Sequence, residues 1–144
     1  MAATVDVNVL VHASDASSAQ HGPARDLVHR MLSGPELFTL FWPVLLGYVR
    51  IVTHSGIFAR PLPLDDAMGA VQALLDAPAV RVLGEGERFW QEYRRLGEHV
   101  PARGNQVPDA VIVALMNEYG VRTIYSRDRD FRRYAHILVI DPFE

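Results

Sequence analysis

The sequence contains no cysteine and no lysine in its 144 residues. Without cysteine, the chain cannot form disulfide bonds, zinc thiolate sites or a thiol nucleophile. Without lysine, it cannot contain a P-loop, a Schiff-base site or a phosphotransfer site built on lysine. All 14 basic residues are therefore arginine, which genomic base composition explains more simply than function does.

The sequence also lacks a long apolar run and has no charged-then-apolar leader at its N-terminus. A helix that spans a bilayer needs about 20 successive apolar residues, and no run here approaches that length. We therefore expect a cytoplasmic protein that has no membrane partner.

Length and composition favour a single folded domain over residues 1–144. Apolar residues make up 49% of the chain and charged residues 22%, which is typical of a globular protein. A chain of this length can bury a sizeable core. The net charge of −3 excludes a strongly basic protein that coats DNA, but it permits a nucleic-acid partner.

Short β-branched runs alternate with amphipathic or apolar segments along the chain. We predict strands over residues 4–11, 37–41, 80–83, 121–125 and 137–140. We predict helices over residues 23–31, 43–52, 66–75, 85–99 and 108–119. This alternation favours an α/β fold, a three-layer α/β/α sandwich with a mostly parallel central sheet.

Four aspartates lie at three places where an apolar run meets a polar one: Asp6, Asp109, Asp128 and Asp130. A carboxylate bordering an apolar run costs free energy unless something neutralises it. In open α/β sheets, ligands bind beyond the carboxyl ends of the strands, and the predicted elements place these residues near that edge. If they meet there, a hard divalent cation is the simplest partner for their charge.

Each aspartate also has a purely structural explanation. Asp109 can favour a helix dipole at the N-terminus, and Asp6 can cap a turn. Asp128 and Asp130 are interleaved with arginines and can form a solvated surface. Asp6 is the hardest to explain alone, because it lies within a predicted apolar strand and needs a partner.

Three segments together resemble the motifs of the PIN domain: residues 6–11, 104–110 and 126–131. More narrowly, they resemble the VapC ribonuclease toxins of type II toxin–antitoxin systems. The resemblance extends from residue 4 to residue 142 and so covers nearly the whole chain. Residues 45–53 are similar to a mycobacterial-type branch of that family.

The resemblance implies a toxin that is a Mg²⁺- or Mn²⁺-dependent endoribonuclease, hydrolysing RNA phosphodiester bonds with a metal-activated water. It also implies a homodimer and a cognate VapB-like antitoxin as partner. The implied metal ligands and catalytic residues are Asp6, Asp109, Asp128 and Asp130. Asn8 and Ser126 would support them by hydrogen bonding. The arginines near the motifs are candidate RNA contacts, namely Arg103, Arg127 and Arg129.

One departure from the family pattern leaves alternatives open. Many PIN domains carry a glutamate where this chain has Gly47, and residues 37–64 contain no acid at all. A catalytically weak or inactive PIN module that binds RNA or a protein is therefore the second hypothesis. A phosphohydrolase of the haloacid-dehalogenase kind is the third. It ranks lower because that chemistry needs an acid where Asn8 stands, and usually a lysine.

Overall fold

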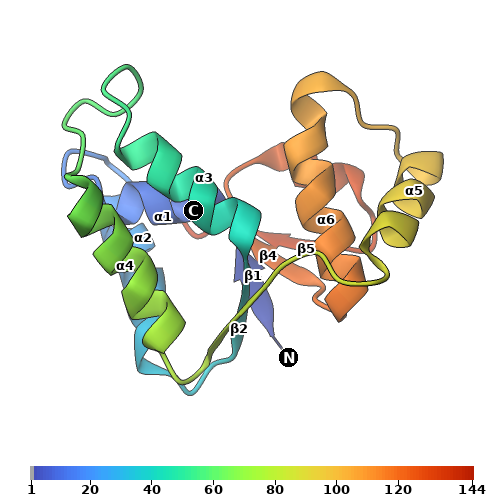
Figure 1. The fold of residues 1–144 in the computed structure, drawn as a ribbon, viewed down its shortest axis with the longest axis horizontal. Helices are drawn as coiled ribbons and strands as arrows, with labels where there is room; N and C mark the ends of the chain where they lie inside the picture. Colours follow the sequence, from blue (N-terminus) through green and yellow to red (C-terminus); the bar gives the residue numbers. More distant parts are fainter. Residues whose placement is uncertain (1) are drawn as a thin grey trace.

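The structure is a computed structural model that describes residues 2–144 (Figure 1). Five strands form one sheet in the order β3-β2-β1-β4-β5, and every pair of neighbouring strands is parallel. The strands are β1 Ala3–Val5, β2 Phe38–Phe41, β3 Val80–Leu83, β4 Thr123–Tyr125 and β5 Leu138–Ile140. The predicted mostly parallel sheet is confirmed.

Six α-helices cover the two faces of this sheet. They are α1 Val7–Ala13, α2 His21–Ser33, α3 Trp42–Val52, α4 Leu64–Asp76, α5 Phe89–His99 and α6 Val107–Tyr119. In Figure 1, α1 to α4 gather on one side of the strands, and α5 and α6 lie on the other. The 3₁₀ helices η1 Gly104–Gln106 and η2 Arg129–Arg133 complete the described elements. The predicted three-layer α/β/α arrangement is therefore confirmed.

Across residues 2–144, every helix is too short or too polar to cross a bilayer.

The predicted strand over residues 4–11 is wrong after Val5. β1 ends at Val5, and α1 begins at Val7. Between them, Asp6 has extended backbone angles, and its carboxylate accepts a hydrogen bond from the Val7 amide, 2.7 Å away. This N-cap ends the strand and starts the helix. The β-branched residues of α1 favour strands, but packing of α1 against α2 and α3 overrides that preference.

The predicted start of α5 at residue 85 is also wrong, because α5 begins at Phe89. The preceding segment instead turns around Glu118 of α6, a side chain that is only 6% exposed. Its two carboxylate oxygens accept hydrogen bonds from the amides of Gly86 and Arg88, each at 3.0 Å. Glu118 therefore joins the entry of α5 to the last turn of α6.

Helix α6 is the most deeply buried helix. An almost continuous stretch of its side chains is buried: Ala110, Ile112, Val113, Ala114, Leu115 and Met116. Gly120 then ends it in a left-handed conformation at φ 72°, as its position after the apolar run predicts. Because the body of α6 is packed in the core, the residues of its first turn have fixed positions at the edge of the sheet.

The contact between Glu118 and the entry of α5 gives a stability prediction. Glu118→Ala removes the acceptor of two amides, and we expect it to lower the free energy of unfolding by about 2 kcal/mol. Glu118→Gln keeps one acceptor oxygen and should cost less. Urea unfolding of these variants, beside Glu98→Ala at an exposed position of α5, measures the difference. Equal stability of Glu118→Ala and Glu98→Ala would contradict this role.

Candidate active site

The candidate site begins where β1 and β4 end side by side. The Asp6 amide donates to the Tyr125 carbonyl at 3.0 Å, which extends the pairing of the two strands by one residue. On the other side of β4, the Ser126 amide donates to the Ile140 carbonyl at 2.9 Å. Asp6 and Ser126 are therefore fixed by backbone hydrogen bonds at the carboxyl edge of the sheet.

The Asp6 carboxylate is buried and held by three donors. It accepts from the Val7 amide at 2.7 Å, from Ser126 Oγ at 2.9 Å and from Asn8 Nδ2 at 3.2 Å. Burial raises the pKa of Asp6, the bonds from Ser126 and Val7 oppose that rise, and the nearby charge of Asp128 adds to it. Asn8 and Ser126 thus both contact the carboxylate that they are expected to support.

A cluster of three acids lies beside Asp6. One carboxylate oxygen from each of Asp109, Asp128 and Asp130 lies within 4.8 Å of the others. Asp109 is in the first turn of α6, while Asp128 caps η2 by accepting from the Asp130 amide at 2.9 Å. The Asp128 amide donates to Ser126 Oγ at 2.9 Å. Ser126 therefore connects Asp6 with this acidic cluster.

Burial and the neighbouring acids act together on the pKa of Asp109. Burial, followed by the charges of Asp6 and Asp128, raises the pKa of Asp109 from 3.8 to about 7. Such a carboxyl group would regain its charge in the presence of a cation. Three carboxylate oxygens this close together are the hard ligands that Mg²⁺ and Mn²⁺ prefer, so the residues present fit a divalent ion.

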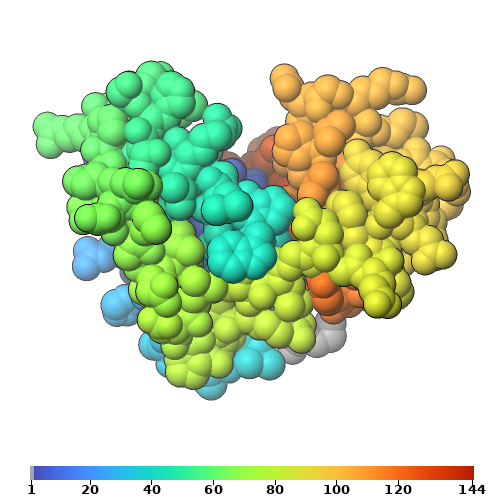
Figure 2. All heavy atoms as spheres, in the orientation of Figure 1, coloured from blue at the N-terminus to red at the C-terminus, as the bar shows by residue number. Residues whose placement is uncertain are grey.

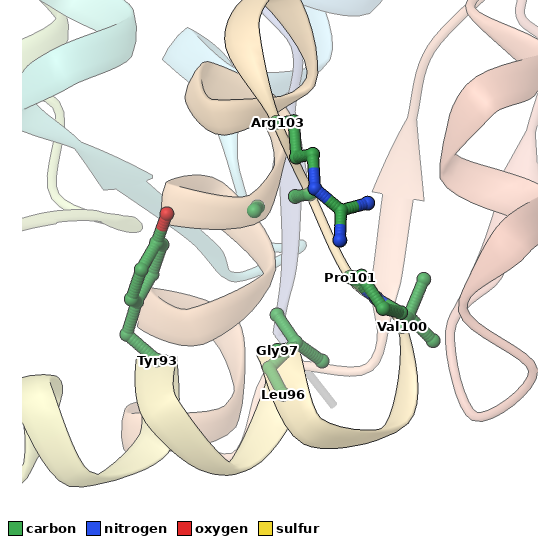
Figure 3. A pocket seen from close by; sticks show the side chains of 8 residues that line it. Tyr93, Leu96, Gly97, Val100, Pro101 and Arg103 are labelled. Carbon is green, nitrogen blue, oxygen red and sulfur yellow. The ribbon is translucent and has the colours of Figure 1, made fainter.

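The three candidate arginines are not gathered at one point. Arg127 and Arg129 are exposed residues on either side of Asp128. Arg103 instead lines a cavity of about 170 Å³ between α5 and α6, where Figure 3 shows its side chain with those of Tyr93 and Leu96. None of these arginines lines the cavity that contains Asp6 and Asp109.

That cavity lies between α3 and α6 and has a volume of about 430 Å³. Figure 2 shows the surface hollowed between the segments of α3 and α6. Asp6, Asp109, Gly47 and Arg50 line it together with apolar side chains, and we call it the α3–α6 cavity. Sequence reasoning missed Arg50, although its position three residues after Gly47 on a predicted helix places both on one face.

The chain is similar to known proteins over almost its whole length. The PIN domain family model matches residues 3–137. Ribonuclease VapC48 of Mycobacterium tuberculosis is 48% identical over 143 residues, which cover 99% of each chain. This family membership decides against the haloacid-dehalogenase alternative.

Solved structures show the same fold. The crystal structure of VapC20 from Mycobacterium tuberculosis has a TM-score of 0.66 and 23% identity, covering 91% of this chain and 93% of that one. The structure of VapBC2 from Rickettsia felis has a TM-score of 0.68 and 12% identity, covering 96% and 97%. The family match and the identity to VapC48 together show that this chain belongs to the PIN domain family, in its mycobacterial VapC ribonuclease branch.

Proposed function

We propose that this chain is the endoribonuclease toxin of a type II toxin–antitoxin pair, with a Mg²⁺ or Mn²⁺ ion as cofactor. One observation carries the proposal: the three close carboxylates of the acidic cluster lie beside the buried Asp6 at the carboxyl edge of the sheet. The relative VapC48, 48% identical over nearly the whole chain, is named a ribonuclease, which supports the same reaction.

In this proposal, Asp6 and the acidic cluster are the catalytic residues and hold the ion. When bound, a divalent ion lowers the pKa of a water molecule and offsets charge on the scissile phosphate. Ser126 and Asn8 keep the Asp6 carboxylate in one orientation through their hydrogen bonds. No carboxylate has to act as the nucleophile. The aspartates serve to position the ion and to balance its positive charge.

The partners follow from the same proposal. RNA is the substrate, and the exposed Arg127 and Arg129 beside the acidic cluster can contact its phosphates, with Arg103 farther along the surface. A cognate VapB-like antitoxin silences the toxin, and the toxin acts as a homodimer in the cytoplasm. The similar Rickettsia felis structure is that of VapBC2 bound to a promoter DNA fragment, which agrees with an antitoxin partner.

The first prediction from the proposed function concerns RNA cleavage. Purified protein should cleave RNA with Mg²⁺ or Mn²⁺, and EDTA should abolish the reaction. Asp6→Asn should lower the rate at least about 100-fold, because it removes a charge from the ion site. Asparagine still caps α1, so the fold should be retained.

The matched control for this experiment is Asp26→Asn, at an exposed position of α2. This variant makes the same chemical change outside the site, so it should cleave RNA at the wild-type rate. Gel analysis of a labelled RNA measures all three proteins. Equal rates for Asp6→Asn and the wild type would refute the proposed function.

The second prediction concerns pH and stability without metal. Because the pKa of Asp109 is raised from 3.8 to about 7, the folded protein binds more protons than the unfolded chain between these values. Stability in EDTA should therefore fall as the pH rises through this range. Asp109→Asn should remove part of the fall. Since water screens the partly exposed Asp109, we expect a gain of about 1–2 kcal/mol near pH 8.

Urea unfolding near pH 5 and near pH 8 measures this effect, and Asp26→Asn again serves as the control. Mn²⁺ should stabilise the wild type near pH 8 and should stabilise Asp109→Asn much less. If the pH dependence of stability is identical in wild type and Asp109→Asn, deprotonation of Asp109 does not destabilise the folded protein.

The third prediction addresses the second candidate function, a weak or inactive PIN module, which the missing carboxylate at Gly47 favours. A Cβ atom at Gly47 would meet Val7 Cγ2 at 3.6 Å, an ordinary contact, so a side chain fits there. Gly47→Glu would add a carboxylate to the wall that also holds Asp6 and Asp109. It should tighten Mn²⁺ binding about tenfold in a calorimetric titration.

Gly69→Glu is the matched control, because Gly69 is an exposed glycine of α4 and a Cβ atom there meets nothing within 4 Å. It should leave Mn²⁺ binding unchanged. Wild-type protein that neither binds Mn²⁺ nor cleaves RNA would favour the inactive module over the nuclease. Unchanged affinity in Gly47→Glu would show that this wall does not face the ion.

A further inference from the structure

The short helix η2 carries two acids of the acidic cluster but is packed less deeply than the helix that carries the third. Asp128 caps η2 and Asp130 lies in its first turn. Of the five residues of η2, only Phe131 is buried, together with Tyr134 directly after the helix. Helix α6, which holds Asp109, is buried almost throughout. The position of η2 relative to Asp109 therefore depends on further contacts near the surface.

Arg133, the last residue of η2, supplies such a contact. Its Nη2 atom donates a hydrogen bond to the Pro101 carbonyl at 2.6 Å, and its guanidinium carbon lies 5.9 Å from the centre of the Tyr134 ring. Pro101 lies just beyond the C-terminal end of α5, as Figure 3 shows. Because α5 packs against α6, this contact joins η2 to the pair of helices that holds Asp109.

We propose that Arg133 is a positioning residue of the nuclease, which holds η2 against the end of α5 and so keeps Asp128 and Asp130 close to Asp109. This inference rests on the proposed nuclease function and adds a residue that contacts neither the ion nor the RNA. Its role differs from that of Arg127, a candidate phosphate contact on the other side of the acids.

The partners of Arg133 are a backbone carbonyl and an aromatic ring instead of an acid. Among residues 2–144, Arg133 takes part in no ion pair. The carbonyl that it binds lies beyond the C-terminal end of α5, where the helix dipole places partial negative charge, so a cation is favoured there. The contact therefore stabilises the end of α5 as well as η2.

These two partners suit an arginine better than a lysine. A planar guanidinium can lie over an aromatic ring and donate a hydrogen bond from its edge at the same time. An ammonium group has no such plane, so it cannot reproduce both contacts in one orientation. Arg133→Lys therefore preserves the positive charge beside the acidic cluster while it disrupts the connection between η2 and α5.

A phosphate contact is the competing role for Arg133, and lysine separates the two roles. Binding of a phosphate depends mainly on charge, so Arg133→Lys would change RNA affinity little, while Arg133→Gln would weaken it and lower its salt dependence. A positioning residue gives another pattern. Both variants should lower the rate of cleavage at saturating RNA, and neither should change KM.

The test compares Arg133→Gln and Arg133→Lys with the same two substitutions at Arg132, an exposed residue of the same helix. Both Arg133 variants should lower kcat about tenfold at unchanged KM, because groups that orient metal ligands have effects of this size. They should also weaken Mn²⁺ binding about tenfold in a calorimetric titration. Both Arg132 variants should keep the wild-type kcat and Mn²⁺ affinity.

Amide hydrogen exchange, followed by mass spectrometry, gives a measurement that needs neither ion nor RNA. In EDTA, the amides of η2 and of residues 100–106 should exchange faster in both Arg133 variants than in wild type, because the contact between the two segments is lost. The amides of β1 and of the buried part of α6 should keep their wild-type exchange, which shows that the fold is retained.

The inference is overturned if Arg133→Lys behaves like wild type while Arg133→Gln raises KM, the pattern of a phosphate contact. It is also overturned if exchange in η2 is unchanged in both Arg133 variants. Failure of the proposed function looks different: wild type would cleave no RNA and bind no Mn²⁺, although exchange in η2 would still be faster in both variants.

Discussion

The structure depends on one buried carboxylate, that of Asp6 at the end of the central strand β1. The same side chain ends β1, caps α1 through the Val7 amide and bonds to Ser126 Oγ, just after β4. These two hydrogen bonds offset part of the cost of burying a charge between apolar segments. Because α1 and the end of β4 are both fixed to Asp6, the acids that follow β4 are placed relative to it.

The rest of the site holds negatively charged aspartates close together although they repel one another. The packing of the fold makes this possible. Asp109 stands in the first turn of α6, a helix whose following residues are buried almost without interruption. It cannot move away from Asp6 and Asp128 without disturbing that packing. Burial of Asp109, together with the charges of Asp6 and Asp128, raises its pKa. Such a group of carboxylates fits the divalent cation of the proposed function.

Local signals in the sequence predicted much of this arrangement. The strand over residues 80–83 and the end of α6 at Gly120 lie where the apolar runs and the glycine place them. The strand over residues 4–11 failed because its β-branched pattern is ambiguous, and the cap at Asp6 decides between strand and helix. The start of α5 depends on Glu118, which is 30 residues away from Arg88 in sequence. Local patterns contain no information about such contacts, nor about the placement of α3 and α6 on opposite walls of one cavity.

The absence of a side chain at Gly47 affects both the acidic site and the α3–α6 cavity. A glutamate here would add negative charge to the wall shared by Asp6 and Asp109, and it would occupy part of the α3–α6 cavity. The two effects oppose each other, because the side chain that would strengthen the ion site would also reduce the volume of the cavity. Because residue 47 is glycine, the acids that line the cavity are Asp6 and Asp109. Arg50, one turn after Gly47 on α3, lines the same cavity. The lining of the cavity therefore carries less negative charge than a glutamate at this position would give it.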